Sequence, residues 1–381
     1  MGTALVTIRK RLSFMLIQTL KLTHFRNYEH QTFSFDPFIN ILIGDNAQGK
    51  TNVLEALALL ANGRSFKTAS NQEMIMFKQD FSVVEGEVIS SEKPLTMKVV
   101  VSNAGKRAFI NKKDIAKLSD YIGYLNVILF QPEDLSLIQG SPKLRRKLID
   151  SEITKISPIY MYNISKYHKL LRERNMYLKT LQKKHASADA YLAVLSEQMA
   201  ALQVDLIHRR QAFVKLLNDI SHTLYGYIGQ EESLSIQYMT RYKEVSKEAI
   251  LAKYEHNYER DIRYATTTDG IQKDDLKIDL NGQDATLYAS QGQQRSIVLA
   301  IKIALVEIVR QEVGEYPVLL LDDVLSELDD IRKTKLLNLI ENKVQTFITT
   351  TSVEGIHHDV VSRAKKMYIN HGKLVKEEYD G

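Results

Sequence analysis

The sequence predicts an α/β fold, a mixed sheet with flanking helices that is interrupted by an inserted helical-hairpin domain. An apolar run at 38–43 leads directly into a glycine-rich loop at 44–51 and then into an apolar segment with helical periodicity. From 133 to about 230 the pattern changes to long amphipathic helices. Apolar strands return at 317–323 and 345–351. The α/β part of the chain is therefore divided between two stretches, one before and one after the insert.

The first stretch contains strands on both sides of the glycine-rich loop. Alternating apolar and polar residues predict strands at 16–22 and 31–35, and the apolar run 38–43 suits a buried strand. The helix after the loop ends at Gly63. Further strands are predicted at 82–89, 95–102, 107–113 and 126–130.

Two long helices form the insert. Their apolar residues recur at a 4-3 spacing, with Arg174 and Arg209 falling within the two stripes. The first stripe contains Tyr160, Ile164, Tyr167, Leu171, Leu178 and Leu181, and the second contains Leu195, Met199, Leu202, Leu206, Phe213, Leu217, Ile220 and Leu224. The polar link 183–190 between them predicts an antiparallel hairpin that is too short for a coiled-coil rod.

Strand character resumes near 277, where Asn281-Gly282 is a hairpin-turn signal. We therefore expect a first lobe at 1–132, the helical domain at 133–262 and a second lobe at 263–381.

Composition restricts the class of protein. The chain has 381 residues, of which 44% are hydrophobic and 25% are charged, as in ordinary globular proteins. It has no cysteine, which excludes disulfides and thiolate catalysis and argues against a zinc site. No apolar run approaches the roughly 20 residues of a membrane span, and we identify no signal peptide. The expected location is cytoplasmic, with no membrane partner.

Positive charge is concentrated in one segment. The net charge is +5, yet 143–184 contains twelve Lys or Arg and three acidic residues. This excess favours contact with a polyanion such as DNA, and Arg145, Arg146 and Lys147 are the candidate DNA-binding residues. The alternative is a solvated helical face.

The loop Gly44-Asp45-Asn46-Ala47-Gln48-Gly49-Lys50-Thr51 matches GxxxxGK[ST]. Its backbone N–H groups can surround phosphates, Lys50 can reach the outer phosphates and Thr51 can bind Mg²⁺. A strand before it and a helix after it favour nucleotide binding over a simple glycine turn.

Two acidic residues end the strand at 317–323. Asp322 can hold the water shell of Mg²⁺, and Asp323 is placed to orient or deprotonate an attacking water. The alternative, a solvated turn, is less favoured beside a phosphate loop.

A second anion cradle is predicted at residues 290–305. Ser290 can cap a helix there, and Gly292 allows close approach to its free N–H groups.

Six segments together resemble the RecF family, in the SMC-like branch of the ABC ATPases. They are FRNYE, GDNAQGKTN, FQPEDLSLIQGSPKLRRKLID, SQGQQRS, LLLDDVLSELD and QTFITTTS, and the resemblance covers Leu16 to Lys373. It implies an ABC-type P-loop ATPase head that binds ATP and Mg²⁺. One departure is at 270–275, where the histidine and arginine expected for the family are absent.

The resemblance also implies roles for individual residues. Residues 44–51 would be the Walker A loop, Asp322 the metal ligand and Asp323 the general base. Gln131 would contact the metal and the attacking water. The signature motif would be Ser290, Gly292 and Gln293, Thr351 would contact the γ-phosphate, and Arg26 and Tyr28 could border the nucleotide.

The expected activity is a weak, DNA-stimulated ATPase that acts as a switch. Two chains would close head-to-tail around ATP, so that each signature motif caps the partner's nucleotide. The implied function is to promote RecA loading with RecO and RecR on gapped or double-stranded DNA, in repair, replication restart and the SOS response. The alternatives are an ABC-type ATPase with a non-DNA role and a nucleotide-gated scaffold.

Overall fold

The computed structural model describes residues 14–91, 93–228, 232–353 and 359–379. The chain divides into two compact units. The first comprises the described residues within 1–134 and 299–381, and the second is Leu135–Val298. The insert predicted at 133–262 stays a prediction of domain bounds; the second compact unit begins at 135 and extends further, to 298. Residues 263–298 belong to the second unit because strand β10 (Asp275–Leu280) pairs with β9 (Leu234–Met239) there.

Two sheets form the first unit. One is antiparallel, in the order β2-β1-β4-β5-β6-β7, and the other has the order β15-β14-β3-β13-β12-β8 and is parallel except for β15. The antiparallel sheet contains β1 (Leu16–Phe25), β2 (Tyr28–Ser34), β4 (Phe81–Ser90), β5 (Lys93–Ser102), β6 (Gly105–Ile110) and β7 (Lys113–Ile115). The other contains β3 (Ile39–Ile43), β8 (Val127–Phe130), β12 (Val318–Asp322), β13 (Thr346–Thr350), β14 (Lys365–Asn370) and β15 (Lys373–Glu378).

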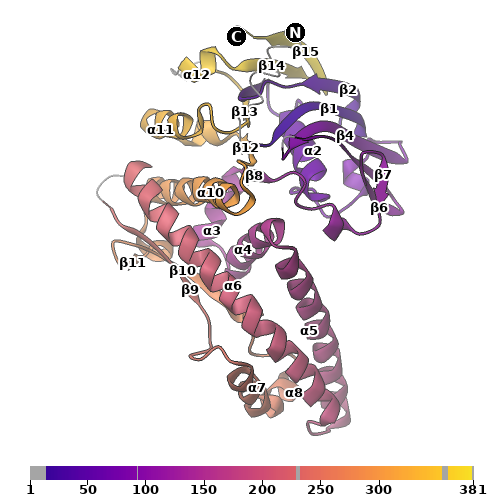
Figure 1. The fold of residues 1–381 in the computed structure, drawn as a ribbon, viewed down its shortest axis with the longest axis vertical. Helices are drawn as coiled ribbons and strands as arrows, with labels where there is room; N and C mark the ends of the chain where they lie inside the picture. Colours follow the sequence, from indigo (N-terminus) through magenta and orange to yellow (C-terminus); the bar gives the residue numbers. More distant parts are fainter. Residues whose placement is uncertain (1–13, 92, 229–231, 354–358, 380–381) are drawn as a thin grey trace. The chain divides into compact units, whose positions relative to one another are not determined.

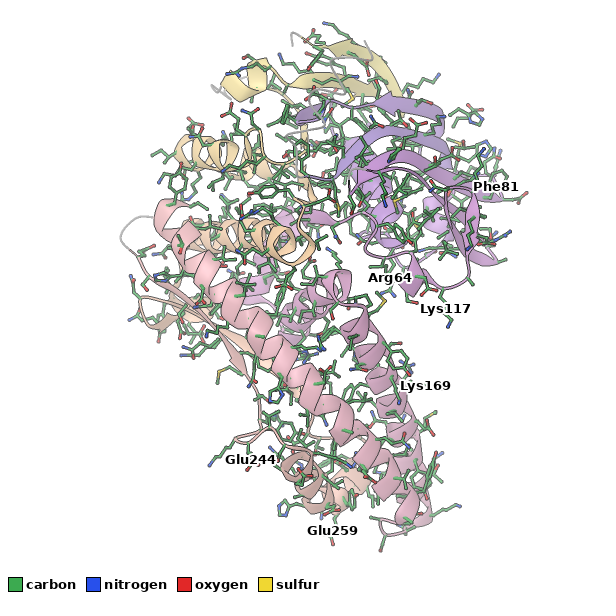
Figure 2. All side chains as sticks on the ribbon, in the orientation of Figure 1. Arg64, Phe81, Lys117, Lys169, Glu244 and Glu259 are labelled. Carbon is green, nitrogen blue, oxygen red and sulfur yellow. The ribbon has the colours of Figure 1, made fainter. Side chains whose placement is uncertain are left out.

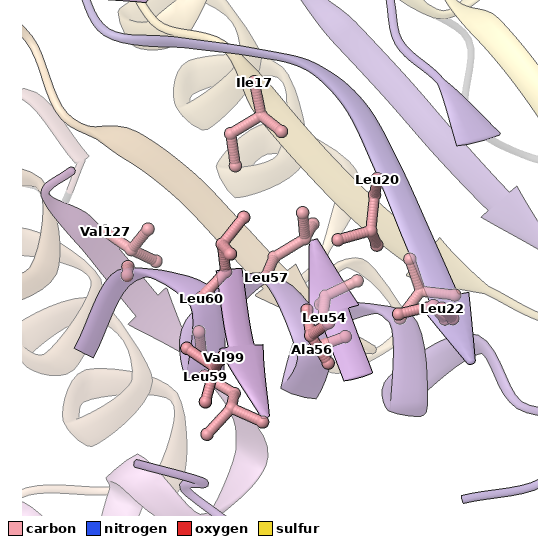
Figure 3. Close-up of a cluster of buried hydrophobic side chains, with 14 of the residues drawn as sticks. Ile17, Leu20, Leu22, Leu54, Ala56, Leu57, Leu59, Leu60, Val99 and Val127 are labelled. Carbon is pink, nitrogen blue, oxygen red and sulfur yellow. The ribbon is translucent and has the colours of Figure 1, made fainter. Parts of the chain in front are cut away.

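Helix α2 (Lys50–Asn62) is the centre of this unit's core. Ten of its thirteen residues are buried, as expected for a helix that is apolar on all sides. Leu57 and Leu60 lie with Leu20 of β1, Val99 of β5 and Val127 of β8 in one apolar cluster (Figure 3). Helices α11 (Asp330–Ile340) and α12 (Asp359–Ser362) also belong to this unit. Helix α2 ends at Gly63, which has the left-handed conformation that favours glycine (φ 62°).

The second unit is built on the predicted helical hairpin. Helices α5 (Pro158–Lys184) and α6 (Ala190–Ile228) run side by side (Figure 1). Around them are α3 (Ser136–Gln139), α4 (Pro142–Ile156), α7 (Lys247–His256), α8 (Tyr258–Tyr264), α9 (Ala285–Tyr288) and the sheet β11-β10-β9, with β11 at Gln283–Asp284. Asn281 and Gly282 both have positive φ, which confirms the hairpin turn. Helix α10 (Gln291–Val313) begins in this unit and ends in the first.

The buried stripe of α6 includes five of the eight predicted apolar residues and departs from the prediction near its C-terminal end, where Ser221 and Tyr225 are buried in place of Ile220 and Leu224. Arg210 is buried and Arg209 is not, and the stripe continues through Phe213, Val214 and Leu217. On α5, Arg174 is fully buried and its guanidinium is 2.8 Å from an Asp261 carboxylate oxygen. No helix in the described part of the chain has both the length and the apolar character needed to cross a membrane.

Candidate nucleotide-binding site

Four neighbouring strands of the parallel sheet end at the same edge. Ile43 pairs with Thr350, Thr349 with Asp322, and Leu321 with Phe130, so the strands end in register. The residues that follow these strands are Gly44, Thr351, Asp323 and Gln131. The structure therefore brings together the ends of four segments that are far apart in the sequence. A crevice beyond the carboxyl ends of such strands is where open α/β sheets bind ligands.

Glycine is required at two positions of the loop 44–51. A Cβ atom on Gly44 would lie 2.3 Å from the Ile369 carbonyl oxygen, and Gly49 has φ 121°. The helix N-cap is Gly49, so no side chain caps α2. The first N–H groups of that helix therefore remain available to an anion, where the helix dipole also favours negative charge.

Two other segments of the chain hold this loop in shape. From the β1–β2 turn, Asn27 Nδ2 donates to the Gln48 carbonyl (3.0 Å) and the Tyr28 hydroxyl donates to the Gly49 carbonyl (3.1 Å). From the β14–β15 turn, the His371 N–H donates to Gln48 Oε1 (2.7 Å) and the Gly372 N–H donates to the Gln48 carbonyl (2.9 Å). Tyr28 is buried, so its hydrogen bond to the loop is shielded from water.

The Lys50 ammonium group donates to the carbonyls of Gly44 (2.5 Å) and Asp45 (2.9 Å) within the same loop. Burial lowers the pKa of Lys50, and the nearby Asp323, Asp322 and Asp45 oppose that shift. Both direct acceptors of this ammonium group are neutral carbonyls, and a phosphate would offer it a charged acceptor instead.

Asp322 and Thr51 form the candidate magnesium site. Thr51 Oγ1 donates to Asp322 Oδ1 (2.9 Å), and Thr349 Oγ1 donates to the same oxygen (2.8 Å). Burial raises the pKa of Asp322, and the two hydroxyl donors oppose the shift. Among the described residues no cluster of three acidic, His or Cys side chains exists that could enclose an ion. This donor set fits Mg²⁺, which binds one or two protein oxygens and completes its shell with phosphate oxygens and water.

Asp323 and Thr351 are exposed at this edge. Asp323 has a left-handed backbone (φ 53°), and its N–H donates to Thr349 Oγ1 (2.8 Å). Because Asp322 and Asp323 occupy successive positions at the strand end, one carboxylate can serve a metal while the other stays accessible to water. Thr349 was not among the residues predicted from the sequence. The one signal for it was a hydroxyl residue on the strand beside Asp322.

Arg26 was expected near a nucleotide, but its guanidinium is engaged elsewhere. It donates through Nε and Nη2 to the two carboxylate oxygens of Glu55 (2.8 and 2.6 Å). Glu55 is fully buried in α2 and also accepts from Ser65 Oγ (2.5 Å). This pair braces the helix that follows the phosphate loop, so Arg26 supports the site indirectly.

The predicted second cradle is described within the second unit. Ser290 caps α10 as expected, and the cap is reciprocal. The Gln293 N–H donates to Ser290 Oγ (3.3 Å), while Gln293 Oε1 accepts from the Ser290 N–H (2.7 Å). Gln293 Nε2 also donates to Glu232 (2.6 Å). Ser290 is exposed and Gly292 is half-buried, so the first turn of α10 is accessible.

Arg145 is not available to DNA, and its prediction as a DNA contact is wrong. Its Nε and Nη2 donate to the two carboxylate oxygens of Asp275 (2.7 and 2.9 Å). Its Nη1 donates to the carbonyls of Leu137 (3.1 Å) and Gly140 (3.0 Å). The side chain is buried because it ties α4 to β10.

The other two predicted DNA contacts differ from each other. Arg146 Nη1 donates to the Asp274 carbonyl (2.6 Å), which leaves Arg146 half-buried, and Lys147 is exposed. The buried Asp274 and the exposed Lys273 lie in the segment 270–275 that departs from the family pattern.

Comparisons with known proteins agree with the geometry of the site. The family model described as RecF/RecN/SMC N terminal domain matches residues 16–375. A protein named DNA replication and repair protein RecF from Bacillus pumilus is 44% identical, over 95% of this chain and 100% of its own. A protein of the same name from Staphylococcus epidermidis is 42% identical, over 95% of this chain and 100% of its own.

Solved structures give the same result. One described as the recombination mediator protein RecF-ATP in the RecFOR pathway has a TM-score of 0.88 and 31% identity, and covers 97% of this chain and 99% of its own. An Smc head bound to a ScpA domain has a TM-score of 0.57 at 16% identity, covers 96% of this chain and 98% of its own, and shares the fold. The fold is therefore that of an ABC-type ATPase head, and the chain belongs to the RecF family.

Proposed function

We propose that this chain is an ATP-dependent recombination mediator that closes as a homodimer around ATP and Mg²⁺ on DNA. The observation that carries the proposal is the single sheet edge at which the phosphate loop, Asp322, Asp323 and Gln131 meet. Lys50 and the loop amides would hold the phosphates, Thr51 and Asp322 the Mg²⁺, and Asp323 the attacking water. Bound Mg²⁺ would neutralise charge on the terminal phosphates.

Dimer closure would use the other cradle. The first turn of α10, with Ser290 and Gly292, would receive the γ-phosphate bound by the partner. The exposure of Ser290 supports this role, because a group already covered within the chain could not do so. Thr351 would contribute a hydroxyl near the γ-phosphate of its own chain. Hydrolysis would then open the dimer and reset the cycle.

The proposed DNA surface is the exposed face of α5, in place of Arg145. This helix contains one acidic residue, Glu173, against a series of exposed cations. The structure gives these cations no carboxylate partner among the described residues, and Lys169 projects outward (Figure 2). They are Lys166, Lys169, Arg172, Lys179, Lys183 and Lys184. From Lys166 to Lys183 they span about 25 Å of helix, most of one turn of duplex DNA.

In the cell, we propose that the protein acts in the cytoplasm with RecO and RecR to promote RecA loading. The DNA would be gapped or double-stranded, and the setting would be DNA repair, replication restart and the SOS response. Support comes from relatives named for replication and repair and from structures of RecF in the RecFOR pathway.

One experiment tests the proposal as a whole. The molar mass of the chain is measured by light scattering with and without ATP, and DNA affinity is measured across salt concentrations. We expect ATP-dependent dimers that bind DNA more tightly than monomers do. A chain that binds ATP without dimerising, or dimerises without gaining DNA affinity, would contradict the proposed cycle.

The DNA surface is tested by replacing Lys166, Lys169 and Lys179 with Ala. Removing three phosphate contacts should reduce the steepness of the plot of log DNA association constant against log salt concentration by about 2.7. The matched control removes three exposed lysines of the first unit, Lys93, Lys343 and Lys373, and should keep the wild-type slope. Equal slopes for the two variants would exclude α5 as the DNA surface.

A further inference from the structure

Lys302 is a buried cation in α10 that the proposed cycle does not use. It is 5% exposed, and its Nζ lies 2.8 Å from Asp134 Oδ1. The same Nζ donates to the Leu129 carbonyl of β8 (2.7 Å). In the chain, Leu129 lies two residues before Gln131 and Asp134 lies three residues after it. Burying an ammonium group is costly unless it is paired, so its position calls for a specific partner.

Asp134 holds the backbone of Gln131 from both ends. Its second carboxylate oxygen, Oδ2, accepts from the Gln131 N–H (2.9 Å). Its own N–H donates to the Gln131 carbonyl (3.0 Å). The contact from the Asp134 side chain to the Gln131 N–H is one half of a capping box, in which the side chain three residues on reaches back to the first residue. Because both backbone groups of Gln131 are held, the direction in which its side chain leaves the strand end is fixed.

Lys302 is what keeps the Asp134 carboxylate in place. Without the ammonium group, the partly buried carboxylate would turn toward water, and the Leu129 carbonyl would lose its donor. Either change releases the backbone of Gln131. We infer that Lys302 is a positioning residue for Gln131 in ATP hydrolysis and acts through Asp134. This inference rests on the proposed role of Gln131 at the metal and the attacking water.

Single-turnover hydrolysis, measured beside equilibrium ATP affinity, tests the inference. Lys302→Met should slow hydrolysis by roughly 10- to 100-fold, the effect of a displacement of about 1 Å, while ATP affinity stays within about twofold. Lys302→Arg keeps the charge and two donors and should restore most of the rate. Arg310→Met removes an exposed ion pair from the same helix and should hydrolyse ATP like the wild type.

The double variant Lys302→Met/Gln131→Ala separates positioning from a second, independent role. If Lys302 acts through Gln131, the double variant should be no slower than Gln131→Ala alone. A double variant whose hydrolysis rate is reduced by the product of the two single effects would refute the inference. If Gln131→Ala is slow and Lys302→Met is not, the inference fails while the proposed function stands. If Gln131→Ala hydrolyses ATP at the wild-type rate, the proposed role of Gln131 fails and takes the inference with it.

A further variant covers the case in which Lys302→Met folds poorly. Lys302→Met/Asp134→Leu removes the buried pair together, which is often neutral for stability. It should fold and bind ATP but still hydrolyse it slowly, because the anchor of Gln131 is gone. Hydrolysis at the wild-type rate would show that Gln131 needs no anchor and would overturn the inference.

Discussion

Replacing Arg145 with methionine should destabilise the protein without changing how it binds DNA. The substitution removes two charge-assisted hydrogen bonds to Asp275 and two hydrogen bonds to the carbonyls of Leu137 and Gly140. Breaking a buried ion pair by removing one partner costs about 3–5 kcal/mol. Asp275 remains 30% exposed and can be partly rehydrated, so the lower end of that range, about 3 kcal/mol, is expected.

Urea unfolding monitored by circular dichroism measures the loss of stability. Lys147→Met, an exposed position of the same helix, is the matched control and should change the free energy of unfolding by less than about 0.5 kcal/mol. Arg145→Lys should recover little, because a lysine cannot donate to both oxygens of Asp275 and to the carbonyls at once. The salt slope of DNA binding should be unchanged in Arg145→Met. A stable Arg145→Met protein with weakened DNA binding would refute the structural role.

Three further predictions concern the nucleotide cycle. Lys50→Ala should abolish ATP binding in a direct titration. Lys50→Arg should impair ATP binding less, because the positive charge survives in a shifted position. Retained ATP affinity in Lys50→Ala would contradict the role of Lys50 in the phosphate loop. Ser290→Arg should bind ATP as a monomer yet fail to dimerise in light scattering. Asp323→Asn should form dimers that persist, because ATP hydrolysis is lost. An ATP-dependent dimer of Ser290→Arg would disprove the proposal that the first turn of α10 caps the partner's nucleotide. Burial raises the pKa of Asp322, so its charged form destabilises the nucleotide-free fold at neutral pH and protonation relieves this as the pH falls through the raised pKa. Without ligand at pH 7, Asp322→Asn should therefore melt at a higher temperature than the wild type. It should also lose the stabilisation that Mg-ATP adds to the wild type. A melting temperature below that of the ligand-free wild type would contradict the cost assigned to the buried charge.

The phosphate loop and the adjacent acidic residues could be predicted from sequence because their signals are local. A glycine-rich loop between an apolar strand and helix, and two acids after an apolar run, depend on neighbours a few residues away. Arg145 could not be assigned this way, because Asp275 lies 130 residues further along the chain. Charge density alone does not distinguish a cation that faces water from one that is paired inside the fold.

The phase of α6 shows a second limit. A strict 4-3 pattern drifts by about 20° per heptad from a straight helix, so the last predicted positions, Ile220 and Leu224, fall one residue before the buried Ser221 and Tyr225. The buried face includes Arg210, which a search for apolar residues rejects. Arg210 is tolerated there because its Nε and Nη2 donate to the two carboxylate oxygens of Asp150 (3.0 and 2.9 Å).

The support of Gln48 by the β14–β15 turn has a consequence for protein synthesis. Gln48 is made early, while His371 and Gly372, which hold it, leave the ribosome more than 300 residues later. In the sheet, β3 likewise lies between β13 and β14, both of which are translated near the end. The nascent chain therefore cannot complete its phosphate loop until almost all of it has emerged. We therefore expect a translation product that stops before residue 371 to fold without the hydrogen bonds that hold Gln48 in the phosphate loop.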